Sequence, residues 1–333
     1  MAAPALAAGS SARSPMTEPT LRPQADQDRA DAKSDAEIES SGGPLTPDEE
    51  EEVEEHAKLR PLAIYEVVRQ EGVEELGRPW QGLWWSGLAA GLSIGISITT
   101  EGTLHALLPE APWRPLVESL GYTVGFLIVI LARQQLFTEI TLTAVLPVLA
   151  HPTRKSLGAL ARNWSVVLVA NLAGTAIFAG VLATEGFLPG FVSKGAQAIS
   201  EHMIEVTPWQ AFLRAVLSGW MMALLVWMLP LAEAARFWAI VLITYLIALF
   251  ELSHVVAGSV EIFLLVFEGR IGLLHGAATY LLPFLAGNVI GGSALFALLA
   301  HVQVWQEMPD REARAHPASR RRPTSYSDKP ADG

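Results

Sequence analysis

Polar side chains in the middle of two long apolar stretches are the residues best placed to do chemistry in this chain. The first stretch, residues 116–150, contains ARQQLFTEITLT, which begins at Ala132. The second stretch, residues 237–267, contains ELSHVVAGSVE, which begins at Glu251. Ionisable side chains and irregular backbone survive at membrane depth only where they line a cavity or are buried in protein. We therefore predict that both segments border a solute path.

The second polar segment holds the only histidine in the middle of an apolar stretch, His254. Its neighbours Ser253 and Gly258 permit an unwound turn, and Glu251 and Glu261 bracket it. One interpretation is a buried neutral imidazole bonded within the protein. We favour a pore role, because ionisable residues inside a membrane usually serve function and an imidazole changes charge near neutral pH. Glu251, three residues earlier, is expected to place a carboxylate beside the imidazole.

The first polar segment combines an apolar pair with a hydroxyl. Leu136 and Phe137 are predicted to narrow the path, and Thr138 to supply a hydroxyl group. Arg133 and Glu139 flank them. Packing is the alternative role for the apolar pair, and Arg133 fits a structural salt bridge or a snorkelling side chain as well as it fits an attractor of anions.

Membrane-spanning helices must position these residues. Hydrophobic residues make up 51% of the 333 residues and charged residues only 17%. A bilayer core takes about 20 apolar residues per helix. We predict an amphipathic surface helix at 61–78, followed by six spans, of which the second and fifth are broken. The spans cover residues 83–108, 116–150, 164–184, 211–231, 237–267 and 273–302.

An internal repeat relates the two halves of the chain. The third and sixth spans both contain Asn-x-x-Gly, at Asn171 and at Asn288, and each follows a broken span. Two halves of three spans each must lie in the membrane with opposite orientation, as inverted repeats do. The alternative is that Asn-x-x-Gly only packs helices closely. Two copies, each after a broken span, favour an all-α membrane protein built as two inverted three-helix repeats.

The chain ends differ in composition from the apolar region between them. Residues 1–59 form a tail rich in Ala, Pro, Ser and acidic residues, which we predict to be disordered, as is the basic tail 309–333. Residues 60–308 are the predicted transmembrane domain. The loop after the second span carries Arg154, Lys155 and Arg162. By the positive-inside rule, both termini are therefore predicted to be cytoplasmic.

Several function classes are excluded or disfavoured. The chain has no cysteine, so disulfides and thiolate metal sites are ruled out. The net charge of −11 argues against a nucleic-acid partner. No HExxH motif and no paired-histidine spacing occurs within the predicted spans. We expect no enzymatic activity, no cofactor and no metal, and the partners are the lipid bilayer and a small solute.

At these motifs the sequence resembles the formate/nitrite transporter family. The resemblance covers roughly residues 62–302 and rests on four motifs. They are LFT at Leu136, RNW followed by ANLAG at Asn171, SHVVA at His254, and AGNVIGG at Asn288. It implies an aquaporin-like hourglass protomer in a homopentamer of the bacterial inner membrane. It also implies passage of small monovalent anions, such as formate or nitrite, past a central histidine.

Two residues depart from the family pattern. The histidine motif of the family usually continues to an asparagine four residues on, where this chain has Gly258. Glu139 follows the threonine, where many members have a small or amide residue. Many members also carry a basic residue near the outer entrance of the pore, and in this chain Lys194 is the only candidate for it. The alternative function is a pore for another small solute, neutral or cationic, which the carboxylates Glu139, Glu251 and Glu261 suggest.

Overall fold

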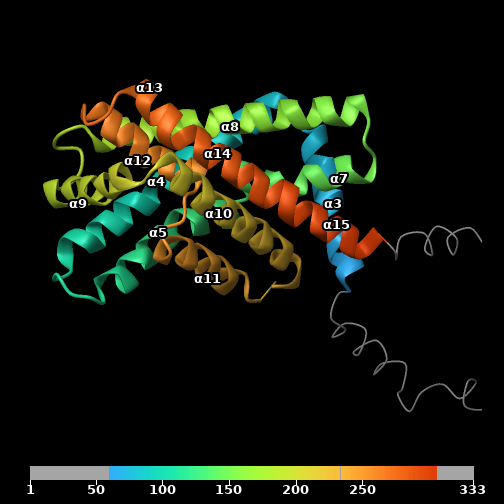
Figure 1. Cartoon of the computed structure of the whole chain (residues 1–333), viewed down its shortest axis with the longest axis horizontal. Coiled ribbons are helices and arrows are strands. Elements are labelled where there is room, and N and C mark those ends of the chain that lie inside the picture. Colours follow the sequence, from blue (N-terminus) through green and yellow to red (C-terminus); the bar gives the residue numbers. More distant parts are fainter. Residues whose placement is uncertain (1–59, 233, 306–333) are drawn as a thin grey trace, which may run out of the picture. The chain divides into compact units, whose positions relative to one another are not determined.

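The described part of the chain is helical throughout. The structure, a computed structural model, describes residues 60–232 and 234–305, and every regular element in these ranges is a helix (Figure 1). This confirms the predicted all-α class. The predicted tails, 1–59 and 309–333, lie outside the described residues.

The first half of the described chain contains seven α-helices. They are α3 (Pro61–Gly77), α4 (Trp80–Leu107), α5 (Arg114–Leu131), α6 (Phe137–Thr143), α7 (Val145–Ala150), α8 (Arg154–Leu182) and α9 (Gly190–Glu201). Local sequence explains several starts: α3 and α5 have proline in the first turn, and α8 begins with a capping box between Thr153 and Ser156.

The second half begins with the short 3-10 helix η1 (His202–Glu205) and ends in one long helical run. Its elements are α10 (Pro208–Met228), η2 (Leu229–Leu231), α11 (Arg236–Leu249), α12 (Val255–Phe267), α13 (Leu273–Gly276), η3 (Ala277–Leu281), α14 (Leu282–Val289), η4 (Ile290–Ala297) and α15 (Leu298–Trp305). The segments η3 and η4 are π-helical stretches within that last run.

By length and composition alone, five helices of the described chain are suited to crossing a membrane. These are Trp80–Leu107, Arg114–Leu131, Arg154–Leu182, Pro208–Leu231 and Leu273–Val304. Three shorter apolar helices accompany them: Phe137–Ala150, Arg236–Leu249 and Val255–Phe267. The chain is therefore a polytopic membrane protein, and each shorter helix adjoins one of two interruptions.

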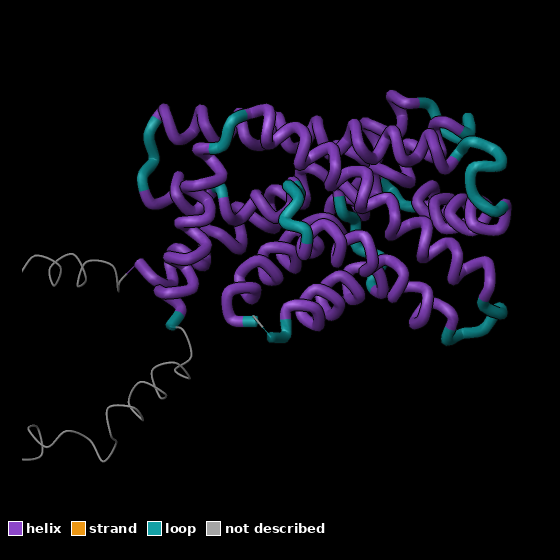
Figure 2. The backbone as a smooth tube through the Cα atoms, turned by 180° about the vertical axis from the view of Figure 1, so that it is seen from behind, coloured by secondary structure: helices purple, strands orange, loops and turns teal. Residues whose placement is uncertain are grey.

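The two interruptions lie inside the helical body (Figure 2). The chain leaves the helix between α5 and α6 and again between α11 and α12. Arg133 has φ 52° in the first interruption and Glu251 has φ 50° in the second. A positive φ is uncommon for non-glycine residues and marks a sharp change of chain direction. Each interruption falls in a segment whose polar residues had predicted a broken span.

Corresponding helices of the two halves pack in the same way. Helix α4 lies against α8, and α10 lies against α14 and η4. Gly91 permits close approach to the Asn171 carbonyl, and Gly219 permits the same approach to the Asn288 carbonyl. In Figure 1, α8 runs from the α7 end towards α9, whereas the run from α13 to α15 goes the opposite way.

One face of helix α3 packs against other helices of the chain. Ile64, Tyr65 and Val68 are buried, and the helix contacts α6, α7, α8 and α15. Burial raises the pKa of Tyr65 to about 12, so the phenol stays protonated at neutral pH. Its hydroxyl lies 2.7 Å from Nδ1 of His301. The predicted surface helix is therefore fixed to the last helix of the chain.

Candidate functional site: two helix breaks that meet at a histidine

The side chain of Asn171, on α8, forms hydrogen bonds with backbone groups at the first helix break. Its Oδ1 accepts a hydrogen bond from the backbone N–H of Phe137 at 2.9 Å. Its Nδ2 donates to the carbonyl oxygens of Gly87 and Gln135, both at 2.8 Å. The side chain is fully buried. One amide therefore pairs three backbone groups, two of them left open by the break, as buried polar groups require.

The side chain of Asn288, on α14, forms the equivalent hydrogen bonds at the second helix break. Its Oδ1 accepts from the backbone N–H of Val255 at 2.8 Å. Its Nδ2 donates to the carbonyls of Ala215 at 2.8 Å and Ser253 at 3.0 Å. Like Asn171, it is fully buried. The two Asn-x-x-Gly copies of the sequence thus have identical hydrogen-bonding roles.

His254 is the N-cap residue of α12 and is held at both ring nitrogens. Its Nδ1 accepts the backbone N–H of Ala257 at 3.1 Å, and its Nε2 lies 2.8 Å from Oγ1 of Thr138. Because an amide N–H can only donate, Nδ1 carries no hydrogen, and the neutral ring carries its hydrogen on Nε2. Nε2–H then donates to Thr138. The hydroxyl hydrogen of Thr138 is then not used in this bond.

This contact joins the two breaks. Thr138 lies in the first turn of α6, and His254 precedes the first residue of α12. Both side chains are almost fully buried, at 0% and 1% exposure. The sequence had placed each in a separate polar segment, and the fold brings them together.

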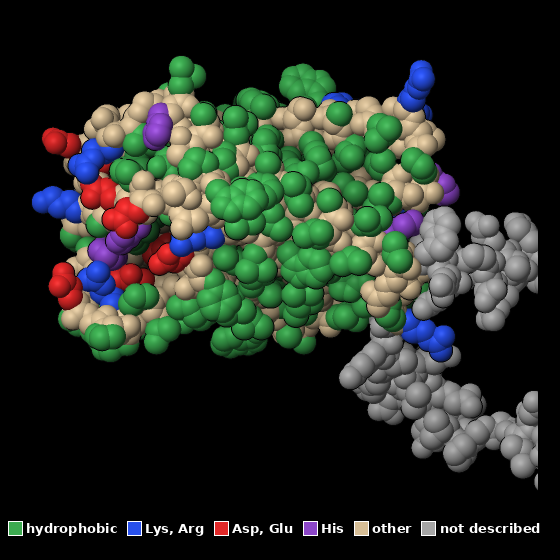
Figure 3. Space-filling view, in the orientation of Figure 1, with side chains coloured by type: hydrophobic (Ala, Val, Ile, Leu, Met, Phe, Trp, Pro, Cys, Tyr) green, Lys and Arg blue, Asp and Glu red, His purple; other side chains and the backbone are tan. Residues whose placement is uncertain are grey.

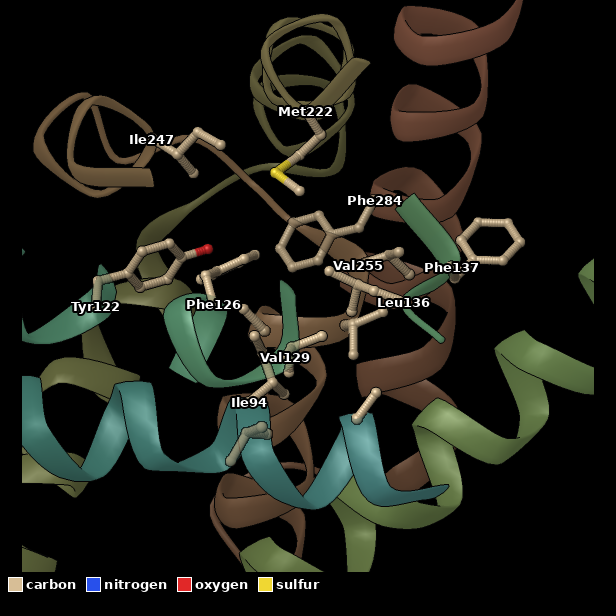
Figure 4. Packing of buried hydrophobic residues seen from close by; sticks show 14 of the residues in the cluster. Ile94, Tyr122, Phe126, Val129, Leu136, Phe137, Met222, Ile247, Val255 and Phe284 are labelled. Atoms are coloured by element: carbon tan, nitrogen blue, oxygen red, sulfur yellow. The ribbon is translucent and has the colours of Figure 1, made fainter. Parts of the chain in front are cut away.

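Buried apolar side chains, among them Phe126, Leu136 and Val255, pack together beside the two breaks (Figure 4). The ring of Phe126 meets the His254 ring edge to face, with centroids 5.0 Å apart. Leu136 and Phe137 are buried, and the Phe137 ring packs against Trp164 at 5.9 Å. In Figure 4, Leu136 lies near Val255, whereas the ring of Phe137 points away from Phe126. Phe126 had not been singled out in the sequence, where it stands among other apolar residues.

Glu251 does not lie against the imidazole. Its side chain is 76% exposed, and its carboxylate pairs with Arg214 at 3.3 Å. The positive φ of Glu251 breaks the helical spacing on which the expected contact with His254 depended. Arg214, on α10, had not been singled out in the sequence.

The other two flanking charges lie apart from the His254–Thr138 pair. Arg133 is exposed, and Glu139 is half-buried on α6. Oε1 of Glu139 has no hydrogen-bond partner among the described residues. Lys194, on α9, is exposed.

A cavity of about 260 Å³ reaches the histidine from one end of the molecule. His254, Ser253, Gly258 and Phe284 line its inner part. Figure 3 shows a hollow among acidic, basic and histidine side chains at the end where α9 lies, beside a broad apolar face. We call this cavity the vestibule. One of its carboxylates, Glu101, lies inside the first predicted span and had not been singled out in the sequence.

Neither a metal centre nor a hydrolase site is indicated. Within residues 60–305 that are described, no group of three or more His, Asp or Glu side chains could hold a metal ion. Residues 91–95, GLSIG, match the G-x-S-x-G pattern of serine hydrolases. They lie inside the continuous helix α4, not at the strand-to-helix turn that this chemistry needs.

Comparison with known proteins identifies the family to which the chain belongs. The family model described as formate/nitrite transporter matches residues 62–302, which is nearly all of the described chain. The chain belongs to the formate/nitrite transporter family. It is therefore a membrane transporter or channel of that family.

Curated members of the formate/nitrite transporter family show different degrees of similarity. Inner membrane protein YfdC of Escherichia coli (strain K12) is 42% identical over 301 residues, covering 89% of this chain and 96% of that protein. Formate channel FocA of Haemophilus influenzae is 29% identical over 185 residues, covering 52% of this chain and 64% of the relative.

Solved structures of the family share the fold. A pentameric formate channel with formate bound has a TM-score of 0.58 at 22% identity, covering 68% of this chain and 98% of that one. An FNT family ion channel has a TM-score of 0.63 at 23% identity, covering 74% and 99%. At these identities the likeness concerns the fold.

The structure explains the departure from the family pattern at Gly258. A Cβ atom at this position would lie 2.8 Å from Cε2 of Phe284. The Phe284 ring therefore takes the space that the asparagine side chain of other family members would enter.

Replacing Gly258 with asparagine is expected to destabilise the protein. Overfilling a packed site costs about 1–3 kcal/mol, so the thermal midpoint in detergent, followed by tryptophan fluorescence, should fall. The double variant Gly258→Asn with Phe284→Ala frees the space and should recover part of the loss. A single variant as stable as the wild type would show that Phe284 is not the obstacle.

Proposed function

We propose that this chain forms a channel or proton-linked transporter for small monovalent anions of the formate and nitrite kind. The observation that carries the proposal is the His254–Thr138 hydrogen bond of 2.8 Å, which links the two helix breaks below an open vestibule. A solute at this point meets the polar pair His254 and Thr138, which lies among buried apolar side chains. Membership of the formate/nitrite transporter family supports this proposal.

The proposed architecture has six crossings, arranged as two inverted three-helix repeats in an aquaporin-like hourglass. The breaks after α5 and α11 lie within the second and fifth crossings. The equivalent hydrogen bonds of Asn171 and Asn288 support the repeat, as do the opposite directions of α8 and α14 in Figure 1. The transmembrane domain spans residues 60–308.

We propose that the protomers form a homopentamer in the bacterial inner membrane, with both termini in the cytoplasm. A related solved structure is a pentameric formate channel, and YfdC of E. coli is an inner membrane protein. The basic residues Arg154, Lys155 and Arg162, which lie in the N-terminal part of α8 and not in a loop as the sequence had suggested, support the orientation. On that orientation, the vestibule opens to the periplasm.

Solute flux in proteoliposomes tests the proposal. The purified protein is reconstituted and assayed with formate, nitrite, hydrosulfide, acetate, ammonium and water. We expect formate or nitrite flux well above that of empty liposomes, and loss of this flux in His254→Phe. The variant Glu110→Gln, on an exposed loop outside the vestibule, is the control. Flux of ammonium alone would overturn the anion proposal.

Leu136 and Phe137 are proposed to narrow the anion path. Replacing both with alanine should widen it, so that acetate crosses nearly as fast as formate. The measurement is the ratio of acetate to formate flux, which is expected to rise several-fold. A matched variant, Leu142→Ala, removes a buried leucine of the same helix. An unchanged flux ratio in the double variant would assign Leu136 and Phe137 to packing alone.

A further inference from the structure

Carboxylates outnumber the arginines among the residues that line the vestibule. Four carboxylates line it: Glu101, Glu118, Glu251 and Glu261.

Two of these carboxylates already have cationic partners. Glu118 pairs with Arg114 at 2.6 Å and lies 3.2 Å from the His105 ring. Glu251 pairs with Arg214 at 3.3 Å. Their charges are thus largely compensated within the protein.

Glu101 and Glu261 have no such compensation. Neither makes an ion pair or a side-chain hydrogen bond with any described residue, and both are half-buried. Each lies within electrostatic reach of the other and of the Tyr122 hydroxyl. Two like charges sharing a partly buried cavity repel each other and lose hydration, so a nearby positive charge would stabilise them.

Buried hydroxyl groups face the same cavity. Ser253 is 9% exposed and Tyr122 is 8% exposed, and both line the vestibule. Neither hydroxyl makes a hydrogen bond to another described residue. Hydroxyl and carboxylate oxygens together form the oxygen-rich surroundings that hard cations and ammonium groups prefer. Arg214, which also lines the vestibule, is already engaged by Glu251.

We propose that the vestibule binds a small monovalent cation between Glu101 and Glu261, with the hydroxyls of Ser253 and Tyr122 as further ligands. The cavity of about 260 Å³ holds an ion of methylammonium size together with several water molecules. The site lies outside His254, at the entrance of the proposed anion path, and its existence does not depend on which solute crosses.

Equilibrium binding of radiolabelled methylammonium to the purified full-length protein tests the site. We expect saturable binding, with ammonium and potassium competing and the bulky cation N-methylglucamine not competing. Glu101→Gln and Glu261→Gln should each weaken binding about tenfold, or about 1.4 kcal/mol. Glu110→Gln removes one carboxylate at an exposed position outside the cavity and should change affinity less than twofold.

Parallel flux measurements separate this proposal from the anion proposal. Absence of saturable methylammonium binding to the folded wild type would overturn the cation site, even if formate flux is normal. Binding that persists unchanged in the Glu101→Gln, Glu261→Gln double variant would place the cation elsewhere and also overturn it. Tight cation binding without anion flux would support the site while removing the proposed function.

Discussion

Formate flux through the reconstituted protein is expected to rise as external pH falls, and His254→Asn is expected to abolish this response. A formate anion loses its water at an apolar constriction, and the neutral acid loses far less. A lower external pH makes a proton available more often on the vestibule side, where His254 can pass it to the anion. Among the buried apolar side chains at this point, His254 and Thr138 are the polar groups at which a proton can be exchanged.

Two substitutions of His254 separate its helix-capping role from its role in transport, and a third substitution tests Thr138. His254 caps α12 through Nδ1, and asparagine is among the best N-capping residues, so His254→Asn should fold. Phenylalanine cannot cap, so His254→Phe should assemble less well and lose the pH response as well. Thr138→Val, which replaces the hydroxyl with a methyl group, should lower flux and cost about 1–3 kcal/mol of stability, because Nε2–H of His254 loses its acceptor. Wild-type flux that is constant between pH of about 5 and 8, or a normal pH response in His254→Phe, would remove the histidine from the mechanism.

Glu251 provides a further control for the histidine. Its carboxylate is engaged by Arg214 at 3.3 Å and is mostly exposed. We therefore expect Glu251→Gln to leave the pH midpoint of flux unchanged. A downward shift of that midpoint would mean that the carboxylate stabilises the protonated imidazole after all.

Asn288→Leu is expected to prevent folding of the transmembrane domain. The substitution leaves the N–H of Val255 and the carbonyls of Ala215 and Ser253 without partners in a buried site. Each unpaired buried group costs about 1–3 kcal/mol, so the total approaches the whole stability of a typical domain. The measurement is the yield of monodisperse protein after detergent extraction. Asn171→Leu should fail equally, because its three bonds are equivalent.

Asn163 supplies the matched control for these two variants. It is also fully buried, but its side chain makes one hydrogen bond, 3.2 Å from Nδ2 to the carbonyl of Glu75. Asn163→Leu should therefore lower the thermal midpoint without abolishing folding. Equal yields for the Asn163 and Asn288 variants would show that the breaks do not depend on the amide at Asn288.

The sequence by itself determined the membrane class, the family and the positions of the two interruptions. Apolar runs of fixed length and polar residues inside them are local features, so they can be read along the chain. The two Asn-x-x-Gly copies predicted a repeat for the same reason. Family membership follows from motifs that are short and local, and the match over residues 62–302 confirms it.

Only the tertiary structure decided which of these residues meet. Thr138 and His254 are 116 residues apart, and their contact depends on how the two breaks are oriented. The backbone turn at Glu251 directs its carboxylate towards Arg214, which no helical spacing predicts. Phe284 fills the space beside Gly258, and Glu101 and Glu261 share one cavity. Long-range packing sets these contacts, because side-chain neighbours across helices depend on crossing geometry and not on sequence distance.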